Sequence, residues 1–97
     1  MNPALLLALC LSLPAMAGQR SAAEVLAFKR STPCPATGKP ELRCPGYEVD
    51  HIEPICAGGR DHRSNMQYLT IQEHRWKTRS DVRFCRQLRK AKQSDER

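Results

Sequence analysis

The amino-acid sequence predicts a small α+β domain in which one helix precedes a β-hairpin and a second helix follows it. Three observations indicate this class. Residues 21–24 have the form of a helix-capping box and begin an apolar stretch. Residues 47–52 and 66–70 have the composition of short strands. Residues 70–73 form a second capping box directly after the second strand. We expect one domain.

The first helix is expected over residues 22–29, because Pro33 limits it downstream. Residues 32–45 follow as a loop rich in Pro and Gly. The strands over 47–52 and 66–70 then pair across a loop, and we expect them to be antiparallel. Together these elements predict a helix packed near a hairpin.

The second helix is expected to begin at Ile71 and to carry His74 and Lys77. Apolar residues continue at helical spacing farther along the chain, at Val82, Cys85 and Leu88. The residues from Gln93 onward are expected to fray. The domain therefore ends in a helical extension.

Residues 1–17 form an apolar leader without a charged side chain. This stretch is too short to span a bilayer comfortably, and it ends in Ala15-Met16-Ala17, the small-x-small pattern of a signal-peptidase site. We expect a signal peptide over 1–17; the alternative is a short membrane anchor, since no basic residue lies near the start. Cleavage leaves residues 18–97 as an exported domain, periplasmic or secreted, without stable membrane association.

The charge of the chain is strongly basic. Lys and Arg number 16 and Asp and Glu number 10, so the net charge is +6, and all of these residues lie within 18–97. A basic exported chain favours a polyanionic partner such as nucleic acid, lipid head groups or acidic polysaccharide. Charge alone does not choose among these partners.

The four cysteines of residues 18–97 are expected to form two disulfides. One Trp, two Tyr and two Phe make a thin core, which calls for a covalent or metal staple. Three connectivities are possible. We prefer Cys34–Cys44, which closes a short Pro-containing loop, with Cys56–Cys85, which ties the central loop to the second helix. A zinc ion held by four thiolates is the alternative, although the C-x2-C pairs of such sites are missing.

Two imidazoles, a carboxylate and an amide stand at spacings that metal-dependent hydrolysis can use. The predicted elements place Asp50 and His51 at the end of the first strand and His74 in the first turns of the second helix. A helix packed across a hairpin brings His74 near Asp50, and this pair forms an open site for a divalent cation. Because His51 leaves the strand in another direction, it is free to take a proton from water.

Four segments resemble a known family. They are GYEVDHIEP at residues 46–54, the pair Gly58-Gly59, Asn65, and EHRWKT at residues 73–78. In this order they resemble the HNH nuclease family, which has the ββα-metal, or His-Me finger, fold. Residues 33–39 and 44–47 resemble a bacterial and phage branch of that family. The motif core is residues 44–80.

The resemblance implies a role for each motif residue. His51 is the general base that activates water, while Asn65 pins the loop and orients His51 through hydrogen bonds. Asp50 and His74 hold one divalent cation, Mg²⁺ first, with Mn²⁺, Ni²⁺ or Zn²⁺ as alternatives. The implied activity is that of a monomeric endonuclease that hydrolyses DNA with low sequence specificity. Basic residues around the motif are expected to bind phosphates; they are Arg60, Lys77 and Arg79.

Simpler interpretations remain beside this one. Asn65 also suits a turn, and His74 also suits a solvated helix position. Two alternatives to the nuclease interpretation remain. The chain is a non-catalytic basic module that binds nucleic acid, or it is a disulfide-stapled secreted effector that acts on membranes or other proteins. RNA stays open as a substrate, because nothing in the sequence addresses the 2′-hydroxyl. The run from Arg83 to Lys92 either extends a track along DNA or keeps the domain soluble.

Overall fold

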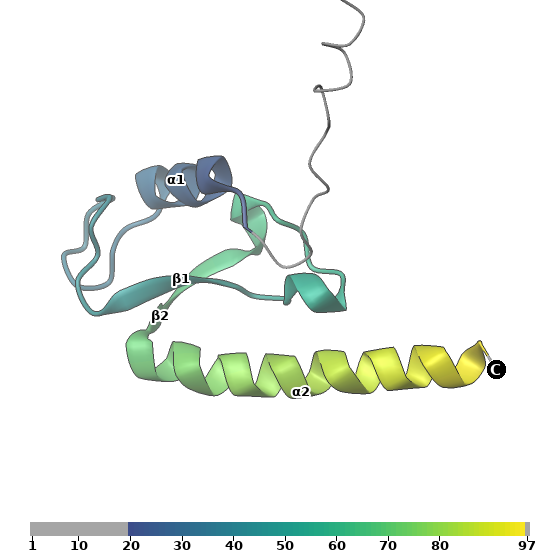
Figure 1. The fold of residues 1–97 in the computed structure, drawn as a ribbon. Coiled ribbons are helices and arrows are strands. Elements are labelled where there is room, and N and C mark those ends of the chain that lie inside the picture. Colours follow the sequence, from purple (N-terminus) through teal and green to yellow (C-terminus); the bar gives the residue numbers. More distant parts are fainter. Residues whose placement is uncertain (1–19, 97) are drawn as a thin grey trace, which may run out of the picture.

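The α+β class is confirmed by the computed structural model, which describes residues 20–96. Two helices enclose a two-stranded antiparallel hairpin, with α1 on one side of the strands and α2 on the other (Figure 1). The elements in chain order are α1 (Ala22–Ser31), β1 (Tyr47–His51), η2 (Ile55–Ala57), η3 (Arg63–Asn65), β2 (Met66–Thr70) and α2 (Ile71–Asp95). The expected signal peptide, residues 1–17, lies outside the described residues.

Helix α1 begins as its capping pattern predicts. Ser21 Oγ accepts a hydrogen bond from the Glu24 backbone N–H at 3.4 Å, which satisfies one free donor of the first turn. The return half of the capping box is replaced by a tertiary contact, because Glu24 Oε1 accepts from the Arg63 N–H at 2.9 Å. The helix runs to Ser31, two residues beyond its expected end, and the extended Thr32 stops it just before Pro33. Glu24 therefore ties α1 to η3.

The hairpin pairs Tyr47 with Thr70 at one end and His51 with Met66 at the other. Strand β1 ends one residue earlier than expected, although the Ile52 N–H still donates to the Asn65 carbonyl at 2.8 Å. The face of the hairpin toward α1 carries the core, which consists of the buried Phe28, Val49 and Met66 with Val25 and Tyr68 packed against it. So small a core leaves much of the stability to other links.

Helix α2 starts at Ile71, as predicted, because both halves of its capping box form. Thr70 Oγ1 accepts from the Glu73 N–H at 3.1 Å, and Glu73 Oε1 accepts from the Thr70 N–H at 2.8 Å. The helix continues to Asp95, so the expectation of fraying from Gln93 is not met. No helix among residues 20–96 has both the length and the apolarity needed to cross a membrane.

Both preferred disulfides are present. Cys34–Cys44 closes the loop between α1 and β1, and Cys56–Cys85 joins η2 to the middle of α2. Cys34 and Cys85 are buried. All four thiols are consumed in pairs, which removes the four-thiolate zinc alternative. In a domain with a small core, each bridge stabilises the fold by about 2–4 kcal/mol.

Candidate functional site

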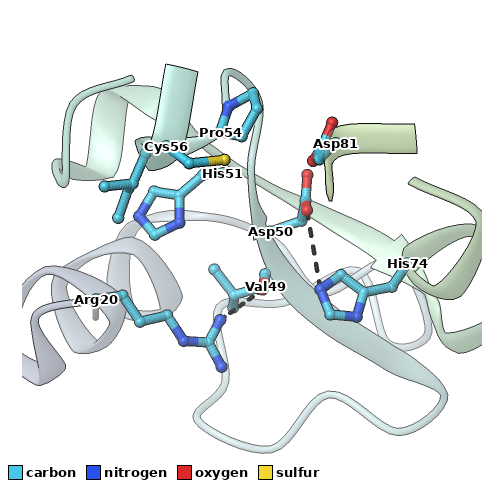
Figure 2. A pocket seen from close by; sticks show the side chains of 9 residues that line it. Arg20, Val49, Asp50, His51, Pro54, Cys56, His74 and Asp81 are labelled. Carbon is cyan, nitrogen blue, oxygen red and sulfur yellow. Dashed lines mark hydrogen bonds and ion pairs between the residues drawn. The ribbon is translucent and has the colours of Figure 1, made fainter. Parts of the chain in front are cut away.

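Asp50 is a buried carboxylate in the face of the hairpin that packs against α2. Only 6% of the residue is exposed, and a carboxylate so enclosed requires hydrogen-bond partners. Its Oδ2 atom accepts from Gln67 Nε2 at 3.0 Å and lies 3.2 Å from Lys77 Nζ. Its Oδ1 atom lies 3.8 Å from His74 Nε2 (Figure 2). The two oxygens thus have separate surroundings, one held by the protein and the other facing His74.

His74 stands in the first turn of α2, between two carboxylates of β1. Glu48 and Asp50 are two residues apart in the strand, so both side chains leave the same face of the sheet. His74 Nδ1 lies 2.6 Å from Glu48 Oε2, while Nε2 faces Asp50. A ring that donates its Nδ1–H to Glu48 keeps the lone pair of Nε2 on the side of Asp50. Carboxylates behind ligating imidazoles fix the ring of metal-binding histidines in this way.

Lys77 supplies a positive charge inside the site. Its ammonium lies 2.6 Å from Asp81 Oδ2 and donates to the His51 carbonyl at 2.8 Å, in addition to the contact with Asp50. Burial disfavours the charged form, but the hydrogen bonds to Asp81 and Asp50 outweigh it and raise the pKa of Lys77. Lys77 was expected to bind phosphate; in the structure it neutralises two carboxylates and anchors the end of β1.

His51 lies across the pocket from His74, with Asp50 between them (Figure 2). Its Nε2 atom is 3.0 Å from Asp61 Oδ1, and Asp61 Oδ2 also accepts from the Ser21 N–H at 2.6 Å. The side chain is 13% exposed, so most of the ring is enclosed by the surrounding chain. In the tautomer that donates Nε2–H to Asp61, the lone pair of the ring lies on Nδ1. Within residues 20–96 no hydrogen bond occupies Nδ1.

Asn65 fastens the loop between the strands. Its Oδ1 atom accepts from the Glu53 N–H at 2.9 Å, and its Nδ2 atom donates to the carbonyls of Glu53 at 2.9 Å and Arg60 at 2.8 Å. The loop-pinning role suits these bonds. The hydrogen bonds described for Asn65 do not reach His51, and the side chain that contacts the ring is Asp61. Asn65 therefore acts on His51 through the loop rather than directly.

The glycine pair lets this loop fold back on itself. Gly58 ends η2 with φ +94°, in the left-handed region that favours glycine. Gly59 donates to the Pro54 carbonyl at 3.0 Å. A Cβ atom at Gly59 would lie 1.9 Å from the Glu53 carbonyl oxygen. The backbone path that brings Asp61 to His51 thus requires glycine at position 59.

A pocket of about 270 Å³ opens among these groups. Asp50, His51, His74 and Asp81 contribute to its wall. Arg20 lines it as well and donates from Nη1 to the Val49 carbonyl at 2.6 Å (Figure 2). The pocket therefore combines an imidazole, a carboxylate–imidazole pair, a second carboxylate and a guanidinium.

The remaining expected phosphate-binding residues lie on the surface. Arg60 and Arg79 are both exposed, Arg60 in the loop between the strands and Arg79 on α2. Residues 20–96 contain no group of three or more His, Cys, Asp or Glu side chains placed to hold one ion. The expected pair, Asp50 and His74, approaches within 3.8 Å between Oδ1 and Nε2.

Five residues of the site were not singled out from the sequence; they are Arg20, Glu48, Asp61, Gln67 and Asp81. Glu48 had a usable signal, because it stands two residues before Asp50 in a predicted strand. Asp61 and Arg20 had none, since each reaches the site only through the path of a loop or of the segment before α1. Comparison with family models, with curated proteins and with solved structures gave no match to this chain.

Proposed function

We propose that this chain is a metal-dependent endonuclease that hydrolyses DNA phosphodiester bonds, with the ββα-metal fold of the HNH nuclease family. The observation that carries the proposal is the position of Asp50 Oδ1, 3.8 Å from His74 Nε2 on one side of the pocket, with His51 on the other side. The order of strand, loop, strand and helix, and the motif resemblance, support it.

The donor pair of Asp50 and His74 fits a divalent cation. Carboxylate oxygens and imidazole nitrogens bind such ions at roughly 2.0–2.4 Å, so two adjacent ligands of one ion are roughly 3–4 Å apart. The separation of 3.8 Å falls in this range. Lys77 and Gln67 occupy the other oxygen of Asp50, so Oδ1 is the atom that would bind the cation. When bound, the cation would neutralise charge on the scissile phosphate and on the leaving oxygen.

His51 suits the role of general base. Its Nδ1 atom is the acceptor for a proton from the attacking water, and Asp61 holds the opposite side of the ring at 3.0 Å. The carboxylate of Asp61 stabilises the imidazolium that forms after proton transfer, as in other carboxylate–histidine pairs. General-base catalysis contributes about 10²–10⁴-fold to a rate. Arg20 adds a positive charge at the pocket wall for the phosphate.

The test is nicking of supercoiled plasmid by the oxidised chain in the presence of Mg²⁺, Mn²⁺, Ni²⁺ or Zn²⁺. We expect nicking that EDTA stops and that His51→Ala loses while its circular dichroism spectrum is unchanged. A matched control is His62→Ala, since His62 lies outside the pocket and caps η3. Undiminished nicking by His51→Ala would contradict the proposal. DNA binding without nicking under all four cations would indicate a non-catalytic binding module.

A further inference from the structure

Five basic side chains form a stripe along one face of α2, separate from the pocket. Their spacing of four, four, three and four residues places them on one side of a helix. All five are exposed. At 1.5 Å per residue, the stripe is about 22 Å long. The members of this α2 basic stripe are Arg75, Arg79, Arg83, Arg86 and Lys90.

The α2 basic stripe faces away from the site. The opposite side of the helix carries His74, Lys77 and Asp81, which contact β1 or line the pocket, and Cys85, which is bonded to Cys56. At about 100° per residue, these four side chains and the stripe lie roughly 150° apart around the helix axis. A phosphate in the pocket is therefore out of reach of most of the stripe.

The charges of the stripe are not balanced within the described chain. No ion pair among residues 20–96 includes any of its five members. The nearby acidic residues of α2 are engaged elsewhere, Glu73 in the helix cap and Asp81 with Lys77. Like charges one helical turn apart repel and weaken a helix. The stripe thus carries a local repulsion that a bound polyanion would relieve.

The part of α2 beyond Cys85 buries no residue against the rest of the described chain. Every described residue from 86 to 96 is exposed, and this yellow end of the helix extends beyond the rest of the described chain (Figure 1). The helix therefore presents the stripe as an arm accessible along its length.

We propose that the α2 basic stripe binds the sugar-phosphate backbone of a nucleic-acid segment other than the one in the pocket. Charge complementarity supports this occupant, because regularly spaced Arg and Lys side chains neutralise phosphates without reading sequence. A lipid surface fits less well. An interfacial helix needs a continuous apolar face, whereas the exposed Trp76, Val82, Phe84 and Leu88 are spread around α2.

Two binding faces on one copy have a consequence for the function. Because the pocket and the stripe point in different directions, one chain can hold two duplex segments at once. The stripe would keep the enzyme bound to one DNA segment while the pocket binds a neighbouring segment. This inference rests on the proposed binding of DNA in the pocket but not on catalysis there, so a catalytically inactive variant that still binds DNA should also bridge duplexes.

The variant that tests the stripe replaces Arg83, Arg86 and Lys90 with Gln, on the side of α2 that faces away from the pocket. The matched control replaces Arg30, Lys39 and Arg43 with Gln. These residues are also exposed and lie outside α2, and their substitution removes the same amount of positive charge. For a mixed-sequence duplex, log affinity falls as log salt rises, and we expect the stripe variant to reduce the magnitude of this negative slope by about 0.9 per lost contact. The control should change it little. Circular dichroism verifies that both variants keep their helices.

Bridging is measured as capture of a fluorescent duplex in solution by an unlabelled duplex on beads. Wild type, the control variant and His51→Ala should capture the label, and the stripe variant should lose most of the capture. Equal losses in the stripe and control variants would show that only net charge matters and would overturn the proposal. So would a stripe variant that keeps duplex binding but loses binding to phosphatidylserine-containing vesicles. If the wild type captures the labelled duplex but does not nick DNA, this result would contradict the proposed enzyme activity and leave the role of the stripe supported.

Discussion

The two sides of the pocket use the same pair of groups in different ways. On the α2 side, the carboxylate of Glu48 lies behind His74, and the other ring nitrogen faces Asp50. On the loop side, the carboxylate of Asp61 lies behind His51, and the other ring nitrogen has no carboxylate before it among the described contacts. The atom in front of each imidazole therefore decides its proposed role. Because His74 faces the Asp50 oxygen, these two groups can bind one cation together. Because the free nitrogen of His51 faces no carboxylate among the described residues, it can act as a base.

Among the substitutions that distinguish the two sides of the pocket, Asp61→Asn is expected to have the largest effect on the rate of nicking. Asparagine can still accept the hydrogen bond from His51 Nε2 through its one oxygen, but it then loses the bond from the Ser21 N–H and cannot stabilise an imidazolium by charge. We expect kcat for plasmid nicking to fall about 10²-fold, within the range that general-base catalysis contributes. Metal affinity should stay within about threefold, because Asp61 lies on the loop side. Isothermal titration with Mn²⁺ alongside the kinetics measures both. A loss of metal affinity with unchanged kcat would reverse the two roles.

Glu48→Ala should affect the other side of the pocket. Removal of a carboxylate behind a ligating histidine typically lowers metal affinity 10–100-fold. Glu48→Gln should recover part of the loss, because its amide oxygen still accepts from His74 Nδ1. Glu41→Ala serves as the control, since Glu41 is an exposed carboxylate in the loop before β1. If Glu48→Ala binds Mn²⁺ as tightly as Glu41→Ala does, Glu48 does not position His74.

The double substitution Cys56→Ser with Cys85→Ser separates fold from chemistry. The bridge joins η2 to α2 beside the pocket, and its loss should lower the free energy of unfolding by about 2–4 kcal/mol. Nicking per folded molecule should fall much less at a temperature where the variant stays folded. Urea unfolding and single-turnover nicking provide the two values. A rate that falls more than the folded fraction would place the disulfide in the site itself.

Glu73→Gln should have the smallest effect. The Thr70 backbone N–H donates to Glu73 and lowers the pKa of that carboxyl, so the contact stabilises the fold above the ordinary pKa of 4.5. This stability is lost as the pH falls through the lowered folded-state pKa. Gln keeps the cap without its charge, so the variant should lose part of this acid dependence. Thermal melts from neutral pH to below pH 4 compare the two chains.

The elements that the sequence predicts best are those with local causes. The start of α2 follows from Thr70 and Glu73, and both disulfide pairs follow from loop length and position. The approach of His74 to Asp50 follows from packing a helix across a hairpin. In each case the signal lies within a few residues or in a simple topology.

The parts that the sequence misses depend on tertiary paths. Asp61 reaches His51 only because the loop bends at Gly58 and Gly59, and no local pattern specifies where that bend points. Glu24 was assigned to its own helix cap, but the structure uses it to hold Arg63. The enclosure of His51 likewise depends on the segments that fold over it. Such contacts between distant segments are not visible in spacing or composition.

The measurement that tests the central claim most directly is a crystal structure of the chain with Mn²⁺, with the ion located by its anomalous scattering. The proposed roles predict one ion bound by Asp50 Oδ1 and His74 Nε2, with His51 unliganded and its Nδ1 atom directed toward a water. An ion ligated by His51, or no ion at Asp50 and His74 at saturating Mn²⁺, would contradict them.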